Sequence, residues 1–232
     1  MTDEKYDILK RYFGYDTFRE GQEQVIDELI SGRDVLGVMP TGAGKSLCYQ
    51  IPALIFPGIT LVISPLISLM KDQVRALNEA GVHAAYLNSS LTQGQYYKAL
   101  SLAAEGRYPI NYVAPERLLT DSFLSFAVHA DIAMVAVDEA HCVSQWGQDF
   151  RPSYLKITEF IEKLPKRPVV AAFTATATKE VRDDIMDLLL LQNPYIVTTG
   201  FDRSNLFFQV ESPKDKYAEV KNYIEQHPDE SG

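Results

Sequence analysis

The sequence predicts an α/β domain in which helices cover both faces of a mainly parallel sheet. Seven short apolar runs recur along the chain, at 34–39, 60–65, 84–88, 110–115, 134–139, 169–175 and 195–200. Amphipathic stretches of helical length separate these runs, and this alternation is typical of parallel strands joined by helices. Nearly every run ends in small, polar or charged residues. Because ligands of such sheets gather at the carboxyl ends of the strands, we expect the functional residues there.

Composition narrows the class of protein. A length of 232 residues with 46% hydrophobic content suits one large domain with a sizeable core. The two cysteines, Cys48 and Cys142, have no CxxC neighbour, so we expect them to pack as small apolar groups in a reducing compartment. No apolar run approaches the roughly 20 residues of a membrane helix. We therefore expect a cytoplasmic protein, associated with the nucleoid if bacterial, that does not contact membranes.

The first chemical signal is the stretch MPTGAGKS, residues 39–46, between an expected strand and an expected helix. Its glycines, Gly42 and Gly44, let backbone N–H groups converge on phosphate oxygens, and Lys45 neutralises the β- and γ-phosphates. Ser46 can ligate magnesium at the helix start. Met39 departs from the full pattern GxxxxGK[ST], which has glycine there. The alternative is a glycine-rich turn with a solvated lysine.

The second signal is MVAVDEAH, an apolar run that ends in Asp138 and Glu139. A carboxylate in this place holds magnesium through water, and its neighbour polarises the attacking water. A plain acidic turn is the alternative. Lys45, Asp138, Glu139 and His141 form the candidate catalytic set, and Ser46 and Asp138 the candidate metal ligands.

With these two motifs in this order, the sequence resembles the first RecA-like lobe of a superfamily 2 helicase. Further stretches narrow the resemblance to the RecQ family of ATP-dependent DNA helicases: YFGYDTFREGQEQVI, LCYQIPAL, SPLISLMKDQV, YVAPERL, DEAHCVSQWGQDFRPSY, TATAT and FDRSNL. The resemblance implies a three-layer RecA-like P-loop NTPase fold for residues 1–206, with ATP and Mg²⁺ as cofactors. Residues 207–232 would be a linker and the start of a truncated second RecA-like lobe.

The resemblance also implies how the nucleotide is held. Tyr15 would stack on adenine, Gln22 would hydrogen-bond its N6 and N7 edge, and Arg19 would approach the nucleotide. A carboxamide donates and accepts at once, which suits adenine. The alternative for Gln22 is an exposed residue in a helix N-cap region. The full set expected to bind the cofactor is Tyr15, Arg19, Gln22, Thr41, Gly42, Ala43, Gly44, Lys45 and Ser46.

Three strand-end loops would lie along the DNA backbone, through Ser64, Pro65, Leu66, Asn88, Ser89, Pro115 and Glu116. Hydroxyls and N–H groups bind phosphate without much net charge, which reconciles DNA binding with a formal net charge of -9. An ordinary capping or turn role is the alternative for any one of these residues, such as Asn88.

In the aromatic-rich loop after His141, Trp146, Phe150 and Arg151 would contact single-stranded DNA and link it to the ATP site. Stacking on a base contributes on the order of 1–3 kcal/mol and tolerates any sequence. Burial of Trp146 and Phe150 in the core is the alternative. Thr174 and Thr176 would act with Trp146 to couple hydrolysis to lobe movement.

The predicted function is ATP-dependent 3′ to 5′ unwinding of DNA, on single strands and duplex junctions. The chain would be the first motor lobe alone and nearly inactive, because the second lobe supplies cationic groups to the ATP site. Two alternatives stay open: a nucleotide- or DNA-binding module with little turnover, and an RNA helicase of the related DEAD or DEAH-box groups.

Overall fold

The computed structural model describes residues 2–147, 149–200, 210 and 212–228, and the chain divides into two units, 1–200 and 201–232. All seven predicted strands are present in the first unit. They are β1 (Val35–Val38), β2 (Ile59–Ile63), β3 (Ala84–Leu87), β4 (Ile110–Val113), β5 (Ile132–Val137), β6 (Val169–Thr174) and β7 (Tyr195–Thr198).

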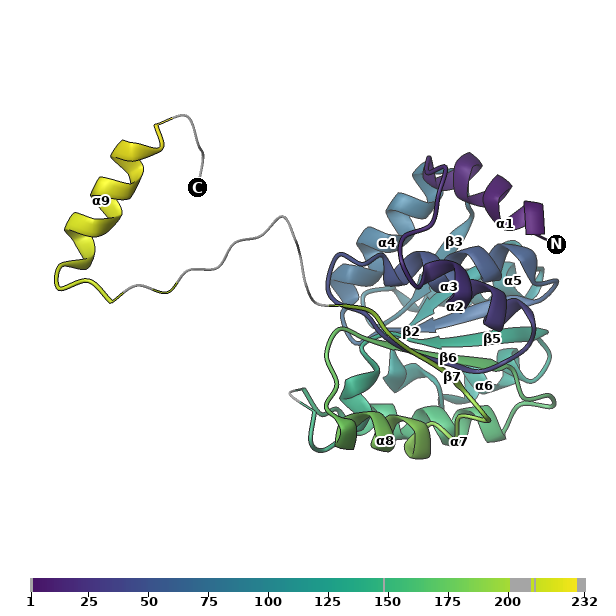
Figure 1. Ribbon diagram of the computed structural model, residues 1–232. Coiled ribbons are helices and arrows are strands. Elements are labelled where there is room, and N and C mark those ends of the chain that lie inside the picture. Colours follow the sequence, from purple (N-terminus) through teal and green to yellow (C-terminus); the bar gives the residue numbers. More distant parts are fainter. Residues whose placement is uncertain (1, 148, 201–209, 211, 229–232) are drawn as a thin grey trace. The chain divides into compact units, whose positions relative to one another are not determined.

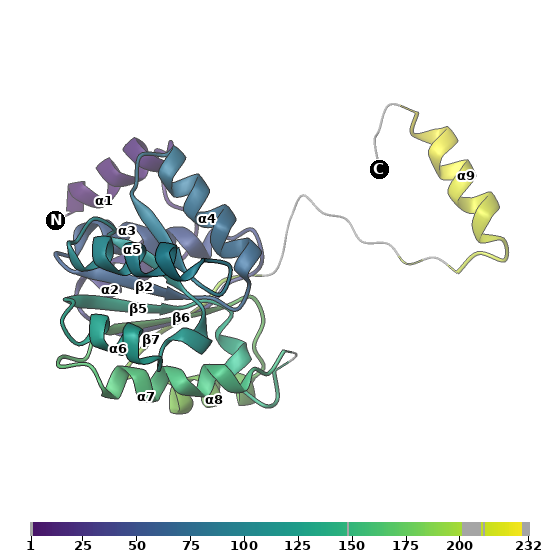
Figure 2. The same ribbon diagram turned by 180° about the vertical axis from the view of Figure 1, so that it is seen from behind.

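These strands form one parallel sheet in the order β3-β4-β2-β5-β6-β1-β7. Its helices are α1 (Thr2–Ile8), α2 (Gln22–Ile30), α3 (Lys45–Ile55), α4 (Ile67–Glu79), α5 (Gln93–Ala104), α6 (Asp121–Ala127), α7 (Lys156–Glu162) and α8 (Lys179–Leu188). Short helical turns lie at η1 (Leu9–Phe13), η2 (Pro115–Arg117), η3 (Ala140–Val143) and η4 (Pro152–Leu155). Helices α3 and α4 cover one face of the sheet, and α7 and α8 cover the other (Figures 1 and 2). The predicted three-layer architecture is therefore confirmed.

Strand β5 shows how the chain builds a core on each face. Met134 and Ala136 point to the core under α2, α3 and α4, whereas Val135 and Val137 point to the core under α5 to α8. Alternate residues of a strand face opposite sides, so a strand buried on both sides must be apolar throughout. This explains why the predicted strands are continuous apolar runs.

A buried carboxylate secures the amino end of the sheet. Asp34, just before β1, pairs with Arg167 at 2.6 Å and accepts hydrogen bonds from the backbone N–H groups of Val170 and Gln192, at 2.9 and 2.7 Å. One side chain thus joins β1, β6 and the segment after α8. Both cysteines are buried and free, and burial raises the pKa of each thiol to about 12. They pack as small apolar groups, as predicted.

The second unit contains the helix α9 (Lys216–Gln226), which has an N-cap at Asp215. The motif FDRSNL at 201–206 and the predicted domain boundary after residue 206 lie outside the described residues. In the part of the chain that the structure describes, no helix is long and apolar enough to cross a membrane.

Candidate nucleotide site and nucleic-acid edge

The carboxyl edge of the sheet carries nearly all of the predicted site residues, and the strand order sorts them into two halves. Strands β1, β6 and β5 lead into the phosphate loop, the TATAT segment and the DEAH turn. Strands β2, β4 and β3 lead into the loops predicted to contact DNA. Because β5 pairs with β2, the two halves adjoin there. The topology therefore places the predicted ATP and DNA residues side by side.

The phosphate loop has the conformation that its glycines predict. Gly42 and Gly44 have φ angles of 85° and 82°, in the left-handed region that favours glycine. A Cβ atom on Gly44 would lie 2.4 Å from Nε2 of Gln22, so a side chain there would be strained by its φ angle and would also displace the Gln22 amide. Met39 continues β1, donates its N–H to Thr174 O at 3.0 Å and is fully buried in the core. A position of this kind has no need of glycine, which explains the departure from the full pattern.

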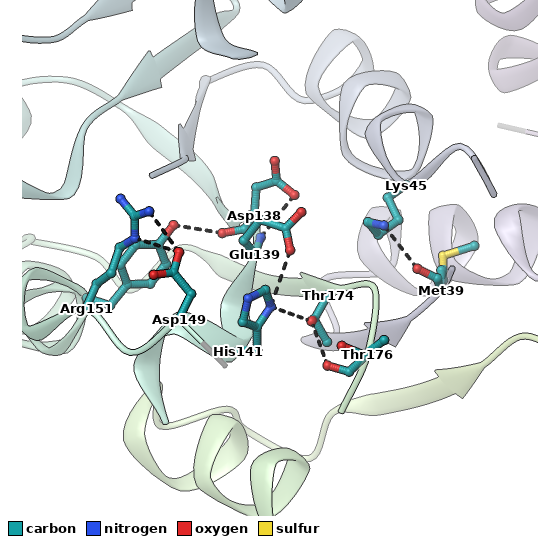
Figure 3. A network of polar contacts seen from close by, with 10 residues as sticks. Met39, Lys45, Asp138, Glu139, His141, Asp149, Arg151, Thr174 and Thr176 are labelled. Carbon is teal, nitrogen blue, oxygen red and sulfur yellow. Dashed lines mark hydrogen bonds and ion pairs between the residues drawn. The ribbon is translucent and has the colours of Figure 1, made fainter. Parts of the chain in front are cut away.

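Figure 3 shows two charged side chains of the site, Lys45 at the phosphate loop and Asp138 at the end of β5. Lys45 Nζ donates to Met39 O at 3.0 Å and belongs to no ion pair among the described residues. Asp138 is buried, and this burial raises the pKa of its carboxyl to about 6, with Glu139 adding to the effect and Lys45 opposing it. A lysine and a buried carboxylate that have no ion-pair partner in the described part of the chain, beside a glycine cradle, fit a phosphate and its Mg²⁺. Ser46, in the first turn of α3, adds a hydroxyl.

The DEAH turn is connected to the TATAT segment through His141 (Figure 3). Glu139 has φ 49° and ψ 47°, which is uncommon for a residue with a side chain and is typical of functional turns. Its Oε2 lies 3.3 Å from His141 Nδ1, which lies 2.8 Å from Thr174 Oγ1. Because the Thr174 hydroxyl donates to Thr176 O at 3.1 Å, it accepts a hydrogen bond from His141. These contacts link the TATAT segment to the Glu139 carboxylate through a single imidazole ring.

A pocket of about 270 Å³ opens beside the phosphate loop, where the sequence predicts the adenine. Tyr15 is half exposed at its rim. Its lining residues are Phe13, Tyr15, Thr17, Arg19, Gln22, Gly44, Ser46 and Leu47. Aromatic rings with a few polar groups are typical of sites that bind small ligands.

Gln22 is the first residue of α2, as the alternative interpretation expects, but it is 1% exposed, so the expectation of an exposed side chain is wrong. Its Nε2 donates to Ala43 O at 3.0 Å and to Gly44 O at 3.1 Å, and its Oε1 accepts from the N–H of Arg19 at 2.8 Å. The Arg19 guanidinium also donates to Gly42 O. Both side chains therefore hold the phosphate loop itself, a role that the sequence did not indicate.

The aromatic-rich loop exposes its tryptophan. Trp146 is 78% exposed, so the alternative of a core tryptophan is wrong, while Phe150 is half-buried. A Cβ atom on Gly147 would lie 2.4 Å from His141 O, which shows how closely the loop packs on the DEAH turn. Arg151 pairs with Asp149 at 2.8 Å and donates to Pro65 O at 3.1 Å. Arg151 thus joins the loop to the end of β2.

The residues predicted on the DNA half fall into two groups. Leu66, Ser89 and Glu116 are exposed and Pro65 is half-buried, whereas Ser64, Asn88 and Pro115 are buried. Asn88 Oδ1 accepts hydrogen bonds from the N–H and the hydroxyl of Ser90, at 2.9 and 2.8 Å, as in a turn. The buried side chains therefore shape these loops, and direct contact with a ligand falls to the exposed groups and the backbone.

Comparisons with known proteins identify the family. Residues 19–184 match the family described as DEAD/DEAH box helicase. The chain belongs to this family. It is 49% identical over 226 residues to the ATP-dependent DNA helicase RecQ of Bacillus subtilis, and the match covers 97% of the chain and 38% of that relative. The protein of the same name from Pasteurella multocida is 50% identical over 200 residues, 86% of the chain and 32% of the relative. The predicted resemblance to RecQ is confirmed, and the chain spans less than two fifths of the length of these relatives.

Solved structures confirm the RecA-like fold of the helicase domain. A hypothetical ATP-dependent RNA helicase from Sulfolobus tokodaii superposes with a TM-score of 0.63 at 22% identity, over 84% of this chain and 57% of that one. The DUF1998 helicase MrfA bound to DNA and AMPPNP gives a TM-score of 0.64 at 18% identity, over 85% and 29%. At these identities the likeness concerns the fold alone.

One contact of the helicase domain, between the aromatic-rich loop and α8, is not predicted by the sequence. Ser144 Oγ donates to Asp184 of α8 at 2.6 Å and accepts from the N–H of Trp146 at 3.1 Å. Asp184 lies inside an amphipathic helix that continues from the TATAT segment, and nothing in its local sequence distinguishes it. The aromatic-rich loop is therefore tied both to the DEAH turn and to α8.

Proposed function

We propose that the chain is the ATP-binding motor lobe of a RecQ-type helicase that unwinds DNA in the 3′ to 5′ direction, coupled to ATP hydrolysis. The observation that carries this proposal is the series of contacts from Glu139 through His141 to Thr174, which adjoins the loop that exposes Trp146. An exposed aromatic ring seven residues after a candidate water-polarising carboxylate suits a motor whose hydrolysis responds to nucleic acid. The identity of 49% with a RecQ protein supports the same assignment.

ATP would occupy the pocket and loop described above. Adenine would stack on Tyr15, and the phosphates would lie on residues 41–46 with Lys45 beside the β- and γ-phosphates. Ser46 and Asp138 would hold Mg²⁺, which supplies positive charge to the phosphoryl group that is transferred. Glu139, oriented by His141, would position the attacking water and accept its proton.

Single-stranded DNA would contact Trp146, Phe150 and Arg151, then the exposed groups at the ends of β2, β4 and β3. A translocating enzyme must hold any base, and stacking on an exposed aromatic ring meets that need. Arg151 would exchange its Asp149 partner for a phosphate, because both groups compete for the same guanidinium fork. The hydrogen bond from Arg151 to Pro65 O places the guanidinium where the ATP half and the DNA half of the edge adjoin.

We infer that the lobe alone binds nucleotide but hydrolyses it slowly. Of the two arginines that the resemblance places near the ligands, Arg19 donates to Gly42 O and Arg151 pairs with Asp149. An arginine aimed at the transferred phosphoryl group contributes on the order of 10³–10⁵ in rate. A second RecA-like lobe would supply it, with residues 1–206 as the first lobe and 207–232 leading into the second. Such a helicase would act in the cytoplasm, on the nucleoid in a bacterium.

The test measures ATP hydrolysis with and without single-stranded DNA or RNA, for this chain and for the chain joined to a second RecA-like lobe. We expect slow hydrolysis by the chain alone and DNA-stimulated hydrolysis by the two-lobe protein. Lys45→Ala should abolish hydrolysis in both, and Trp146→Ala should reduce the stimulation more than it reduces nucleotide binding. Strong stimulation by RNA and none by DNA would refute the DNA assignment in favour of an RNA helicase. Full DNA-stimulated hydrolysis by the chain alone would refute the need for a second lobe.

A further inference from the structure

The segment formed by α1 and η1 packs on α2 and α3, away from the two cores of the sheet (Figure 1). A separate apolar cluster holds it there, in which Ile8 and Leu9 are buried with Ile26 of α2 and Ile51 of α3. Phe13, the last residue of η1, packs against this cluster and also lines the pocket beside the phosphate loop. The segment therefore leads into one wall of that pocket, although α1 has no role in the function proposed above.

Lys5 of α1 carries a buried ammonium that two carboxylates of α2 hold. Its Nζ lies 2.9 Å from Glu23 Oε1 and 2.5 Å from Asp27 Oδ1, and its side chain is 2% exposed. A buried charge is tolerated where it is paired in this way. The two carboxylates lie one turn apart on α2, whose first residue is Gln22. The ion pairs therefore fix α1 to the turn of α2 that borders the pocket.

Tyr6, the next residue of α1, contacts both α2 and the loop that precedes it. Its hydroxyl donates to Glu23 Oε1 at 2.6 Å, and the centroid of its ring lies 5.1 Å from that of Phe18. This hydrogen bond lowers the pKa of the Glu23 carboxyl, which favours the ionised form. Phe18 stands between Thr17 and Arg19, and both of these residues line the pocket. Tyr6 therefore packs directly behind the wall of the pocket.

The turn η1 connects α1 to the pocket without an intervening loop. It is wound as a π-helix, which is rare and often lies at functional sites, and it ends at Gly14 with a φ angle of 73°. Tyr15 follows at the pocket rim. A further ion pair joins Lys10 to Asp16 at 2.9 Å, but both side chains are about three-quarters exposed, so water screens it. The buried ammonium of Lys5 is therefore the charged group of this segment best able to fix the loop.

We propose that α1 positions the adenine pocket, with Lys5 and Tyr6 as positioning residues that hold the loop of residues 14–21 against the start of α2. A loop that is already ordered spares the ligand the cost of ordering it on binding. The inference rests on the proposed function, because it takes this pocket as the site of the base. It assigns no chemical step to α1.

The packing of α2 makes the expected effect specific for the base. Val25 and Leu29 of α2 are buried in the core above the sheet, which does not depend on α1. Loss of the α1 contacts should therefore loosen the wall that carries Tyr15 and leave Gln22 and the phosphate loop in place. A ligand with a base should bind more weakly, whereas a ligand that consists of phosphates alone should bind as before.

The test measures the affinity of this chain for ATP and for inorganic tripolyphosphate, both with Mg²⁺, by titration calorimetry. Lys5→Met removes the ammonium and keeps an apolar stem, and it should weaken ATP about 5-fold with no change for tripolyphosphate. Lys5→Arg can pair with the same two carboxylates and should restore ATP binding. Tyr6→Phe keeps the ring against Phe18 but removes the hydrogen bond, and it should weaken ATP about 3-fold.

Lys10→Met is the matched control. It makes the same change of charge in the same segment but removes only the exposed pair with Asp16, so both affinities should stay unchanged. The melting temperature of each variant reports folding. Glu23 and Asp27 are 40% and 54% exposed, so water can take the place of the Lys5 ammonium and the fold should persist.

The outcomes separate the role of α1 from the function on which it rests. If the unmodified chain binds both ligands but Lys5→Met binds ATP as Lys10→Met does, the role of α1 is wrong and the proposed function stands. An equal loss of ATP and tripolyphosphate in Lys5→Met would also overturn it, since a general defect of the site affects both ligands. If Lys5→Met does not fold, unchanged ATP binding by Tyr6→Phe overturns it instead. If the unmodified chain binds neither ligand, both proposals fail.

Discussion

Substitution of Gln22 tests whether its hydrogen bonds to the phosphate loop contribute to nucleotide binding. Its two amide hydrogens reach Ala43 O and Gly44 O, and its oxygen accepts from the backbone of Arg19. A net contribution of about 0.5–1.5 kcal/mol for each of the two bonds to the loop gives about 1–3 kcal/mol in all. Since 1.4 kcal/mol is about tenfold in affinity, loss of the loop contact in Gln22→Ala should weaken the binding of GTP by about 10-fold and that of ATP by at least as much.

A second variant separates the loop contact from recognition of the base. Gln22→Glu keeps an acceptor for Arg19 and for an adenine amino group, but it places carboxylate oxygens against two carbonyl oxygens of the loop. It should therefore weaken ATP and GTP by similar factors and leave their ratio nearly unchanged. Gln22→Ala removes the acceptor as well and should lower the preference for ATP.

The assay is competition of ATP and GTP against a fluorescent nucleotide, together with the melting temperature of each variant. Gln24→Ala is the matched control, because Gln24 is exposed two positions along the same helix. It should bind both nucleotides as the unmodified chain does. Weaker binding of ATP with unchanged binding of GTP in both Gln22 variants would refute the loop contact and leave Gln22 as a reader of the base alone.

Three further predictions concern the supports of the site. Asp184→Ala should free the Trp146 loop from α8, and the emission anisotropy of Trp146, which is the chain's one tryptophan, should fall. The control Asp183→Ala should leave this anisotropy unchanged, and identical anisotropy in both variants would contradict the contact. Asp138→Asn should raise the free energy of unfolding of the nucleotide-free protein at pH 7 by on the order of 3 kcal/mol, measured by urea titration. Folding raises the pKa of the Asp138 carboxyl from 3.8 to about 6, so the unmodified protein loses stability as pH rises between these two values. The stability gained by Asp138→Asn should therefore be complete above pH 6 and absent below pH 3.8. A gain that does not depend on pH would refute this cause. Asp34→Ala should lower the free energy of unfolding by about 3–5 kcal/mol, because it leaves Arg167 and two backbone N–H groups without their acceptor, and a loss below about 1 kcal/mol would contradict this.

The sequence by itself determined the layers of the fold and the phosphate loop. A strand buried on both faces must be apolar throughout, and a loop that wraps a phosphate needs glycine at left-handed positions such as Gly42 and Gly44. Both requirements constrain residues that are neighbours in the sequence, so short stretches of sequence are enough to predict the strands and the phosphate loop. For the same reason the apolar run that ends in Asp138 and Glu139 was enough to place this pair at the carboxyl edge of the sheet.

The tertiary structure decided every question that depends on which distant segments meet. Gln22 is buried because the phosphate loop, some twenty residues later, packs over the start of α2, and Trp146 is exposed because its loop turns outward from the DEAH turn. The role of Asp184 as the hydrogen-bond acceptor of Ser144 depends on the contact between α8 and the aromatic-rich loop. Burial and pairing are properties of the packed chain, since a side chain's local sequence does not specify the groups that will surround it.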